Sequence, residues 1–265
     1  MHELTTEQYF SVLPLLQDIN HKAVFALSVI EQNQKGKVYV NNREIPTAIL
    51  VMSCGGFYCL AGDESDDSFV MSVVDHLNNS LNHPNFFALA LYTEAWEKKL
   101  SLFKILNAKR IIRSYYRFNK EKFLEQISHL FVAPVDSITY HGLDIEIACQ
   151  YRNHFYSYYQ LVWDTDIHFC ELGYGHFYIK HGEIVSVCTS PYVGGGFVEI
   201  DIITIDGYQR RGLATRLGIE FINDCLKNEK IPNWCCHSDN VESNLLAMKL
   251  GFEKIDEREM YWYSM

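Results

Sequence analysis

The second half of the chain alternates between segments with the apolar period of a strand and segments with the apolar period of a helix. Residues 197–204 form a strand-like run, and the residues after Gly212 place large apolar side chains about every four positions, as on one face of a helix. Gly251 should end a second helix, because glycine is the residue that most often closes one. The pattern predicts strands at 176–180, 183–190, 197–204, 232–237 and 254–263, and helices from 213 onward and at 241–250.

The first half shows the same order of elements. Pro14 should interrupt its first helix, because proline lacks the N–H that an interior helical position needs. Gly55 and Gly56 separate two apolar runs, which is typical of a β-hairpin. The pattern predicts helices at 6–32, from about 67 to 79, at 94–106 and at 120–130, and strands at 45–53, 57–61, 86–92 and 109–118.

These parallel patterns predict a mixed α/β protein of the α+β class, built from two tandem copies of one fold. The sequence Ala-Pro-Val-Asp at 133–136 is a suitable boundary, because proline disfavours continuation of the preceding helix. We therefore expect one domain at 1–132 and a second at 133–265. Within the second domain, the Tyr-rich segment 140–160 precedes the predicted strands and is expected to be partly helical.

Composition and charge narrow the possible partners. The chain has 265 residues and a formal net charge of −10, which argues against a nucleic-acid or anionic membrane surface, since both need clustered positive charge. Its eight cysteines form no Cys-x-x-Cys pair, as expected for reduced thiols rather than a disulfide framework. The N-terminal residues lack the features of a signal peptide, and no apolar run is long enough to span a bilayer. We therefore expect a cytoplasmic protein.

A basic, glycine-containing turn at Gln209–Ala214 joins a predicted strand to a predicted helix. Free backbone N–H groups and the positive end of the helix dipole would both face an anion placed there. The side chains of Arg210 and Arg211 add charge-assisted donors suited to a pyrophosphate. The equivalent junction of the first half, at 61–67, is acidic and would repel such a group. We therefore expect a single phosphate site, in the second half.

Through this turn, the sequence resembles the GCN5-related N-acetyltransferase superfamily, in particular a bacterial branch with a divergent N-terminal half. The family's pyrophosphate motif, Gln/Arg-x-x-Gly-x-Gly/Ala, is matched by Gln209, Gly212 and Ala214. The segment from Asn240 to Phe252 also fits the family pattern, and the likeness extends over 173–263. The resemblance implies a central, mostly antiparallel sheet that splays apart, flanked by helices, with a degenerate first copy.

The resemblance also implies acetyl-CoA as the co-substrate, with no metal ion. The Thr204 backbone would pair with the pantetheine arm, and the Ile202 amide would polarise the thioester carbonyl as it becomes an oxyanion. The Asn240 side chain matches a position that touches either the pantetheine or the start of its own helix. The backbone amides expected to receive the pyrophosphate are those of Arg210, Arg211, Gly212, Leu213, Ala214 and Thr215.

An amine acceptor must lose a proton, and Glu199 and Asp201 are the candidate bases. They lie two positions apart on one strand, so they share a face unless a bulge intervenes. The alternative is that both are ordinary outward-facing carboxylates or an anchor for a substrate ammonium. One departure from the family pattern is Ala247, where many members carry a tyrosine that protonates the CoA thiolate. Tyr208, Tyr261 and Tyr263 are possible substitutes, although core packing suits each of them.

Three other groups of residues are weaker candidates for a site. The histidines at 168, 176, 181 and 237 have no compact zinc-ligand spacing, so a metal site is not expected. Cys235 and His237 share a strand face, but a thiol nucleophile is disfavoured against ordinary packing. The aromatic cluster 151–163 is typical of a core or an interdomain seam, and could also line an acceptor pocket.

The expected function is transfer of an acetyl group from acetyl-CoA to a primary amine, directly and without an acyl-enzyme. The excess of acidic residues expected around the cleft favours a cationic acceptor. A non-catalytic acyl-CoA-binding or regulatory module is the alternative, supported by Ala247, and a longer acyl donor or another acceptor atom is a third possibility. Dimerisation through the strands of the second half stays open.

Overall fold

The structure is a computed structural model that describes residues 1–82, 86–128, 137–155 and 158–264. The first half contains β1 (His2–Glu3), η1 (Thr6–Ile19), α1 (Val24–Ile30), β2 (Gly36–Val40), β3 (Ala48–Ser53), β4 (Phe57–Gly62), α2 (Asp67–Asn78), η2 (Ser80–Asn82), β5 (Phe86–Leu91), α3 (Glu94–Leu100), β6 (Lys109–Phe118) and α4 (Lys120–Ser128). The second half contains β7 (Thr139–Gly142), α5 (Ile145–His154), α6 (Tyr159–Val162), α7 (Asp166–Leu172), β8 (Gly175–Lys180), β9 (Glu183–Thr189), β10 (Val193–Gly194), β11 (Phe197–Glu199), β12 (Asp201–Thr204), α8 (Leu213–Lys227), β13 (Ile231–His237), α9 (Val241–Lys249) and β14 (Phe252–Ser264).

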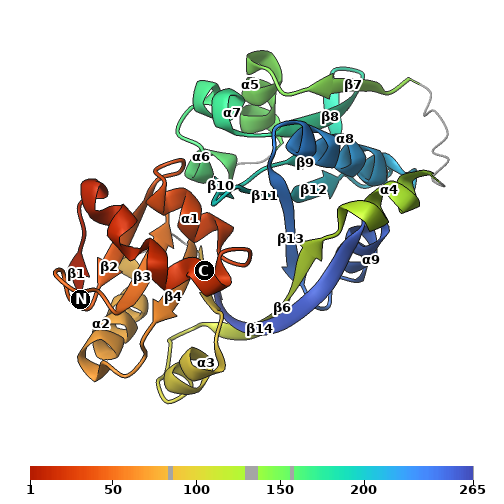
Figure 1. Ribbon diagram of the computed structural model, residues 1–265. Coiled ribbons are helices and arrows are strands. Elements are labelled where there is room, and N and C mark those ends of the chain that lie inside the picture. Colours follow the sequence, from red (N-terminus) through yellow and green to blue (C-terminus); the bar gives the residue numbers. More distant parts are fainter. Residues whose placement is uncertain (83–85, 129–136, 156–157, 265) are drawn as a thin grey trace.

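Two sheets carry the fold (Figure 1). The larger has the strand order β1-β2-β3-β4-β5-β14-β6-β13-β11-β10, and the smaller has the order β12-β9-β8-β7. Neighbouring strands are antiparallel except in the pairs β4–β5 and β11–β13. The predicted mixed α/β fold with a mostly antiparallel sheet is therefore confirmed.

In the first-half strands, successive apolar side chains point to opposite faces of the sheet, and each face packs in its own hydrophobic core. One set of alternate residues in β3, β4 and β5, including Leu50, Leu60 and Leu89, packs with α2 and α3. The intervening residues, including Val51 and Cys59, pack on the opposite side with η1 and α1, in a core that continues into the second half. Because successive strand residues point to opposite faces, this alternation lets one sheet carry helices on both sides.

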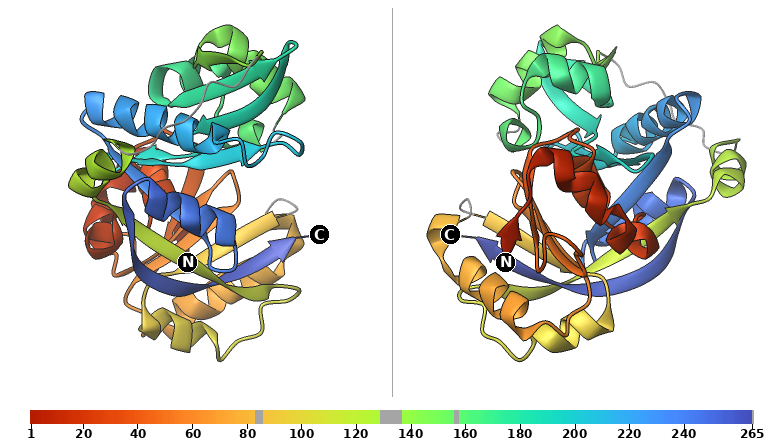
Figure 2. Two further views of the ribbon diagram at one scale, coloured as in Figure 1. Left: turned by 90° about the vertical axis from the view of Figure 1, so that its right-hand side faces the viewer. Right: turned by 60° about the vertical axis from the view of Figure 1, so that its left-hand side comes forward.

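Each half contains one parallel strand pair joined by a helix, β4–α2–β5 in the first half and β11/β12–α8–β13 in the second. The two halves share the large sheet, because β14 is inserted between β5 and β6, and β6 pairs with β13. Figures 1 and 2 show β14 curving from the second half into the first. The predicted boundary at 132/133 lies outside the described residues and stays a prediction.

The two parallel pairs differ in one respect that decides where a ligand can enter. β4 and β5 stay paired from Phe57↔Ala88 to Leu60↔Leu91. In the second half, β11 pairs with β13 only up to Glu199↔Asn233, and the following strand, β12, pairs with β9 instead. Ile200 marks the change, and its N–H donates to the Asn233 carbonyl at 3.0 Å. Only the second half therefore opens between its parallel strands.

Some predicted elements have different bounds in the structure. In place of the single helix expected over 6–32, the structure has a 3-10 helix, η1, followed by the α-helix α1. The interruption between them lies at residues 20–23 rather than at Pro14. Strand β2 was not predicted; in the structure its five residues pair with β1 on one side and with β3 on the other. The helix predicted to reach residue 106 ends at Leu100. No helix within the described ranges combines the length and apolar composition needed to cross a bilayer.

Candidate functional site

The basic turn is folded as an open N-terminus of α8. Gly212 is the N-cap residue and has a φ of +78°, in the left-handed region that glycine adopts without strain, and Arg210 also has a positive φ of +59°. None of the backbone N–H groups from 210 to 215 donates a hydrogen bond to a described residue. Unpaired donors at a helix N-terminus form a natural site for an anion.

Side chains around this turn either hold it in place or bring positive charge to it. Gln209 holds the turn to the preceding strand, because its Nε2 donates to the Thr204 carbonyl at 3.2 Å and to Asp206 Oδ1 at 3.1 Å. The Arg211 guanidinium lies over the Tyr208 ring, 5.2 Å from its centroid. Lys249 Nζ donates to Thr215 Oγ1 at 3.4 Å, which brings a second positive charge to the start of α8.

The corresponding helix of the first half, α2, has a closed N-terminus. Its N-cap residue is Asp66, whose carboxylate accepts a hydrogen bond from the Phe69 N–H at 3.0 Å. The same carboxylate accepts from Ser68 Oγ at 2.9 Å and Asn41 Nδ2 at 3.2 Å. The chain's own carboxylate therefore occupies the place that an external anion would take. This difference matches the acidic junction seen in the sequence.

Strand β12 presents its free edge toward the opening beside β13. The Ile205 N–H donates to the Val185 carbonyl at 3.1 Å, which makes this a hydrogen-bonded pair of the antiparallel ladder. Because hydrogen-bonded and non-hydrogen-bonded pairs alternate, the N–H groups of Ile202 and Thr204 point away from β9. β12 is an edge strand, so these groups face the opening. The backbone direction expected for both residues is thus present.

Asn240 lies at the start of α9 and caps that helix. Its side-chain oxygen accepts from the Ser243 N–H at 3.0 Å, and its carbonyl accepts from Asn244 Nδ2 at 2.6 Å. Of the two contacts expected for this side chain, the structure shows the one with the start of its own helix.

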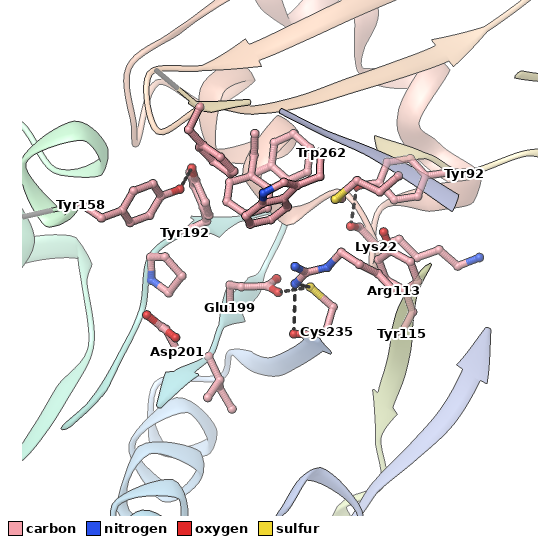
Figure 3. Close-up of a pocket in the computed structure, with 16 residues that line it drawn as sticks. Lys22, Tyr92, Arg113, Tyr115, Tyr158, Tyr192, Glu199, Asp201, Cys235 and Trp262 are labelled. Atoms are coloured by element: carbon pink, nitrogen blue, oxygen red, sulfur yellow. Dashed lines mark hydrogen bonds between the residues drawn. The ribbon is translucent and has the colours of Figure 1, made fainter. Parts of the chain in front are cut away.

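A cavity of about 360 Å³ lies where β11 gives way to β12 (Figure 3). Glu199 and Asp201 both line it, as expected for residues two apart in an extended segment, and Ile200 between them lines it as well. The other lining residues come from both halves of the chain. They are Lys22, Phe25, Phe57, Phe86, Tyr92, Arg113, Tyr115, Tyr158, Pro191, Tyr192, Cys235, Met260 and Trp262.

Glu199 is held in a hydrogen-bonded group with Cys235 and Arg113. Its Oε1 accepts from the Cys235 thiol at 2.9 Å and its Oε2 accepts from Asn233 Nδ2 at 2.7 Å. Arg113 Nη2 donates to the Cys235 carbonyl at 3.2 Å and to its Sγ at 2.9 Å. Burial is the main cause that raises the pKa of both the Glu199 carboxyl and the Cys235 thiol. Cys235 is therefore a neutral hydrogen-bond donor, not a thiolate nucleophile.

Asp201 is the less constrained of the two carboxylates. Burial raises its pKa to about 6, with the nearby Glu199 adding to the shift and the Arg113 charge and the Ile202 N–H opposing it. A carboxylate with a pKa near the operating pH is well matched to proton transfer.

This raised pKa predicts that Asp201 destabilises the folded protein when ionised. The folded pKa is about 6 and the ordinary value is 3.8, so the penalty is absent below about pH 4 and complete above about pH 6. Asp201→Asn should therefore raise the free energy of unfolding at pH 8 by up to about 3 kcal/mol. Urea unfolding at pH 8 and pH 4 measures the difference, which should vanish at the lower pH. A variant that is less stable than wild type at pH 8 contradicts this assignment.

The weaker sequence candidates lie in different surroundings. Tyr261 and Tyr263 are buried in the core with α2 and α3, and neither lines the cavity. The histidines at 168, 176, 181 and 237 lie on separate elements, and the described residues contain no group of three or more His, Cys, Asp or Glu side chains placed to hold a metal ion. All eight cysteines are free thiols. Within the aromatic cluster 151–163, Tyr158 lines the cavity, whereas Tyr151 and Trp163 are core residues.

Sequence reasoning missed the residues that form most of the cavity wall. Arg113, Phe57, Phe86 and Trp262 lie on β6, β4, β5 and β14, and all of these strands were predicted. Their common position depends on the insertion of β14 beside β5 and on the pairing of β6 with β13. No local pattern carries that information.

Comparison with known proteins gives a match over most of the chain. The sequence model of a family described as GNAT acetyltransferase matches residues 13–261. A Bacillus subtilis (strain 168) protein described as the uncharacterized N-acetyltransferase YdfB is 28% identical over 267 residues, spanning 99% of this chain and 98% of that protein.

Solved structures resemble the chain over its full length. A GCN5-related N-acetyltransferase-like protein from Streptococcus suis has a TM-score of 0.73 at 21% identity, covering 97% of this chain and 98% of that one. A tandem GNAT protein from the clavulanic acid biosynthesis pathway has a TM-score of 0.64 at 10% identity, covering 98% and 97%. These likenesses concern the fold, and they confirm the predicted architecture of two tandem halves.

Proposed function

The chain belongs to the GNAT acetyltransferase family, and from this premise we propose that it transfers an acetyl group from acetyl-CoA to a primary amine bound in the cavity. The observation that carries the proposal is the position of the cavity at the opening between β12 and β13. The same strand, β12, leads to the basic turn at Gln209–Ala214 with its unpaired backbone amides, which we call the cradle. Asp201 and Thr204 are three residues apart, which is about 10 Å along a strand. The donor and the acceptor would therefore meet at β12.

The cradle is proposed to hold the pyrophosphate of acetyl-CoA. The unpaired amides from 210 to 215, the dipole of α8 and the arginines at 210 and 211 all favour an anion there. The pantetheine arm would run along the free edge of β12, where the Thr204 backbone can pair with it. The α2 terminus is capped by Asp66, so the proposal assigns one cofactor site to the chain.

The proposed reaction is a direct transfer. Asp201 first accepts one proton from the bound ammonium, which weakens its interaction with the Ile202 N–H. The neutral amine nitrogen attacks the thioester carbonyl carbon, and the Ile202 N–H stabilises the oxyanion that forms. The nitrogen then loses its second proton to solvent, and the C–S bond breaks to release the CoA thiolate. Ala247 is fully buried and has no proton to give, so the thiolate takes its proton from solvent. Glu199 keeps its hydrogen bonds to Cys235 and Asn233 and contributes negative charge near the amine.

A non-catalytic acyl-CoA-binding role is the second candidate, and Ala247 is the observation that favours it. Isothermal calorimetry with CoA and acetyl-CoA, followed by a thiol-release assay over a panel of amines, separates the two. The proposal expects binding of both ligands and amine-dependent thiol release above the blank without amine. Binding without release by any amine supports the non-catalytic module, and no binding of CoA contradicts both functions.

A further inference from the structure

Resting on the proposed function, we infer that the acceptor is an aromatic monoamine, whose ring is bound by the first half of the chain. The sequence alone favoured cationic acceptors in general. The cavity wall narrows this class, because it combines a continuous aromatic surface with a local charge balance suited to one ammonium group.

The aromatic surface is a chain of rings in contact. Phe25 and Phe57 have centroids 5.7 Å apart, Phe57 and Phe86 5.8 Å, and Phe86 and Trp262 4.6 Å with an edge-to-face geometry. Tyr192 extends this surface, 6.0 Å from Phe57. Such spacings are those of favourable aromatic pairs, and an aromatic ligand would add a further ring to the series.

Most of this wall comes from the first half. Phe25 lies on α1, Phe57 on β4 and Phe86 on β5, while Trp262 lies on the part of β14 that pairs with β5. The first half has a capped helix N-terminus and closed parallel strands in place of a cofactor site. Its role in the reaction would thus be to bind the acceptor.

The charged groups of the cavity favour one positive charge on the ligand. Glu199 and Asp201 supply two carboxylates, and Arg113 supplies one guanidinium. Lys22 also lines the cavity, but it forms an ion pair with Asp256. One negative charge therefore remains to be balanced, which a single ammonium would do. A second cationic group on the ligand would lie near Arg113 and Lys22 and would be repelled.

The cavity volume also suits a small aromatic amine. About 360 Å³ is near the lower end of the range for small-molecule pockets. This space accommodates one ring system with a short side chain better than a polycation or an aminoglycoside, because the rings of Phe25, Phe57 and Phe86 on one side of the cavity offer no hydrogen-bond partner to a polar ligand surface.

A panel of amines tests the substrate class in the thiol-release assay. The probes are 2-phenylethylamine, propylamine, which lacks the ring, spermidine, which adds charges, and L-phenylalanine, which adds a carboxylate. The expected kcat/KM for 2-phenylethylamine is at least tenfold above each of the other three. Higher kcat/KM for spermidine, propylamine or L-phenylalanine overturns the inference and leaves the proposed function intact. Thiol release by none of many amines, with CoA still bound, contradicts the proposed function itself.

Substitutions in the wall provide a second test. Trp262→Ala should raise the KM for 2-phenylethylamine at least tenfold, while the KM for acetyl-CoA changes less than twofold and Trp262→Phe restores most of the loss. Phe86→Leu is a milder variant with the same expected direction, should Trp262→Ala fold poorly. Phe10→Ala, at an exposed position outside the cavity, is the control. An unchanged KM for the amine in both wall variants overturns the inference.

Discussion

Asp201→Asn should lower kcat by two to four orders of magnitude, the usual contribution of a general base. The amide has nearly the same shape as the carboxylate but cannot accept the proton that the amine loses. Because a base acts in its ionised form, the wild-type kcat should rise with pH through about 6 and then level off. The kcat of the variant should not show this rise near pH 6. The pH profile of kcat, measured by thiol release with saturating acetyl-CoA and amine, provides the test.

Glu199→Gln is the matched control for this prediction, because Glu199 lines the same cavity and lies two residues before Asp201 in the chain. Its carboxylate already accepts hydrogen bonds from Cys235 and Asn233, so its replacement should lower kcat by only about tenfold and should keep the rise near pH 6. A larger loss in Glu199→Gln than in Asp201→Asn would transfer the role of base to Glu199. The same Asp201→Asn protein should also be more stable at pH 8, which distinguishes lost chemistry from unfolding.

Gly212→Asp should weaken the binding of CoA at least 100-fold. Gly212 is the N-cap residue of α8 and faces the unpaired amides of the cradle. A carboxylate there would lie beside the unpaired amides and would repel the pyrophosphate. Isothermal calorimetry with CoA measures the loss.

Gly212→Asn is the control for the cradle. Asparagine tolerates the left-handed conformation about as well as aspartate and has nearly the same shape, so the two variants differ mainly in charge. The asparagine variant should bind CoA at least tenfold more tightly than the aspartate variant, and the gap should narrow at high ionic strength because salt screens exposed charges. Equal affinities of the two variants, at equal melting temperatures, would contradict an electrostatic role for this turn.

Local elements were predictable because their signals lie within a few residues. The strand predicted at 109–118 has the same bounds as β6, and the hairpin at Gly55 and Gly56 joins β3 and β4 as expected. The helix predicted from about 67 to 79 corresponds to α2, Asp67–Asn78. Prediction failed for β2, since a strand of five residues is stabilised mainly by its neighbours, here β1 and β3.

The cradle, like these local elements, could be predicted from the sequence, whereas the cavity could not. The α+β class, the tandem order of elements and the turn at Gln209–Ala214 were predictable without coordinates, because helix and strand periods and a glycine-containing turn are properties of contiguous residues. The tertiary structure was needed to show that Glu199 and Asp201 face a cavity, because the opposite wall of that cavity comes from strands of the first half. It also decided that Arg113, Phe86 and Trp262 share one cavity, because side chains from strands far apart in sequence meet only through the pairing and order of those strands in the sheet.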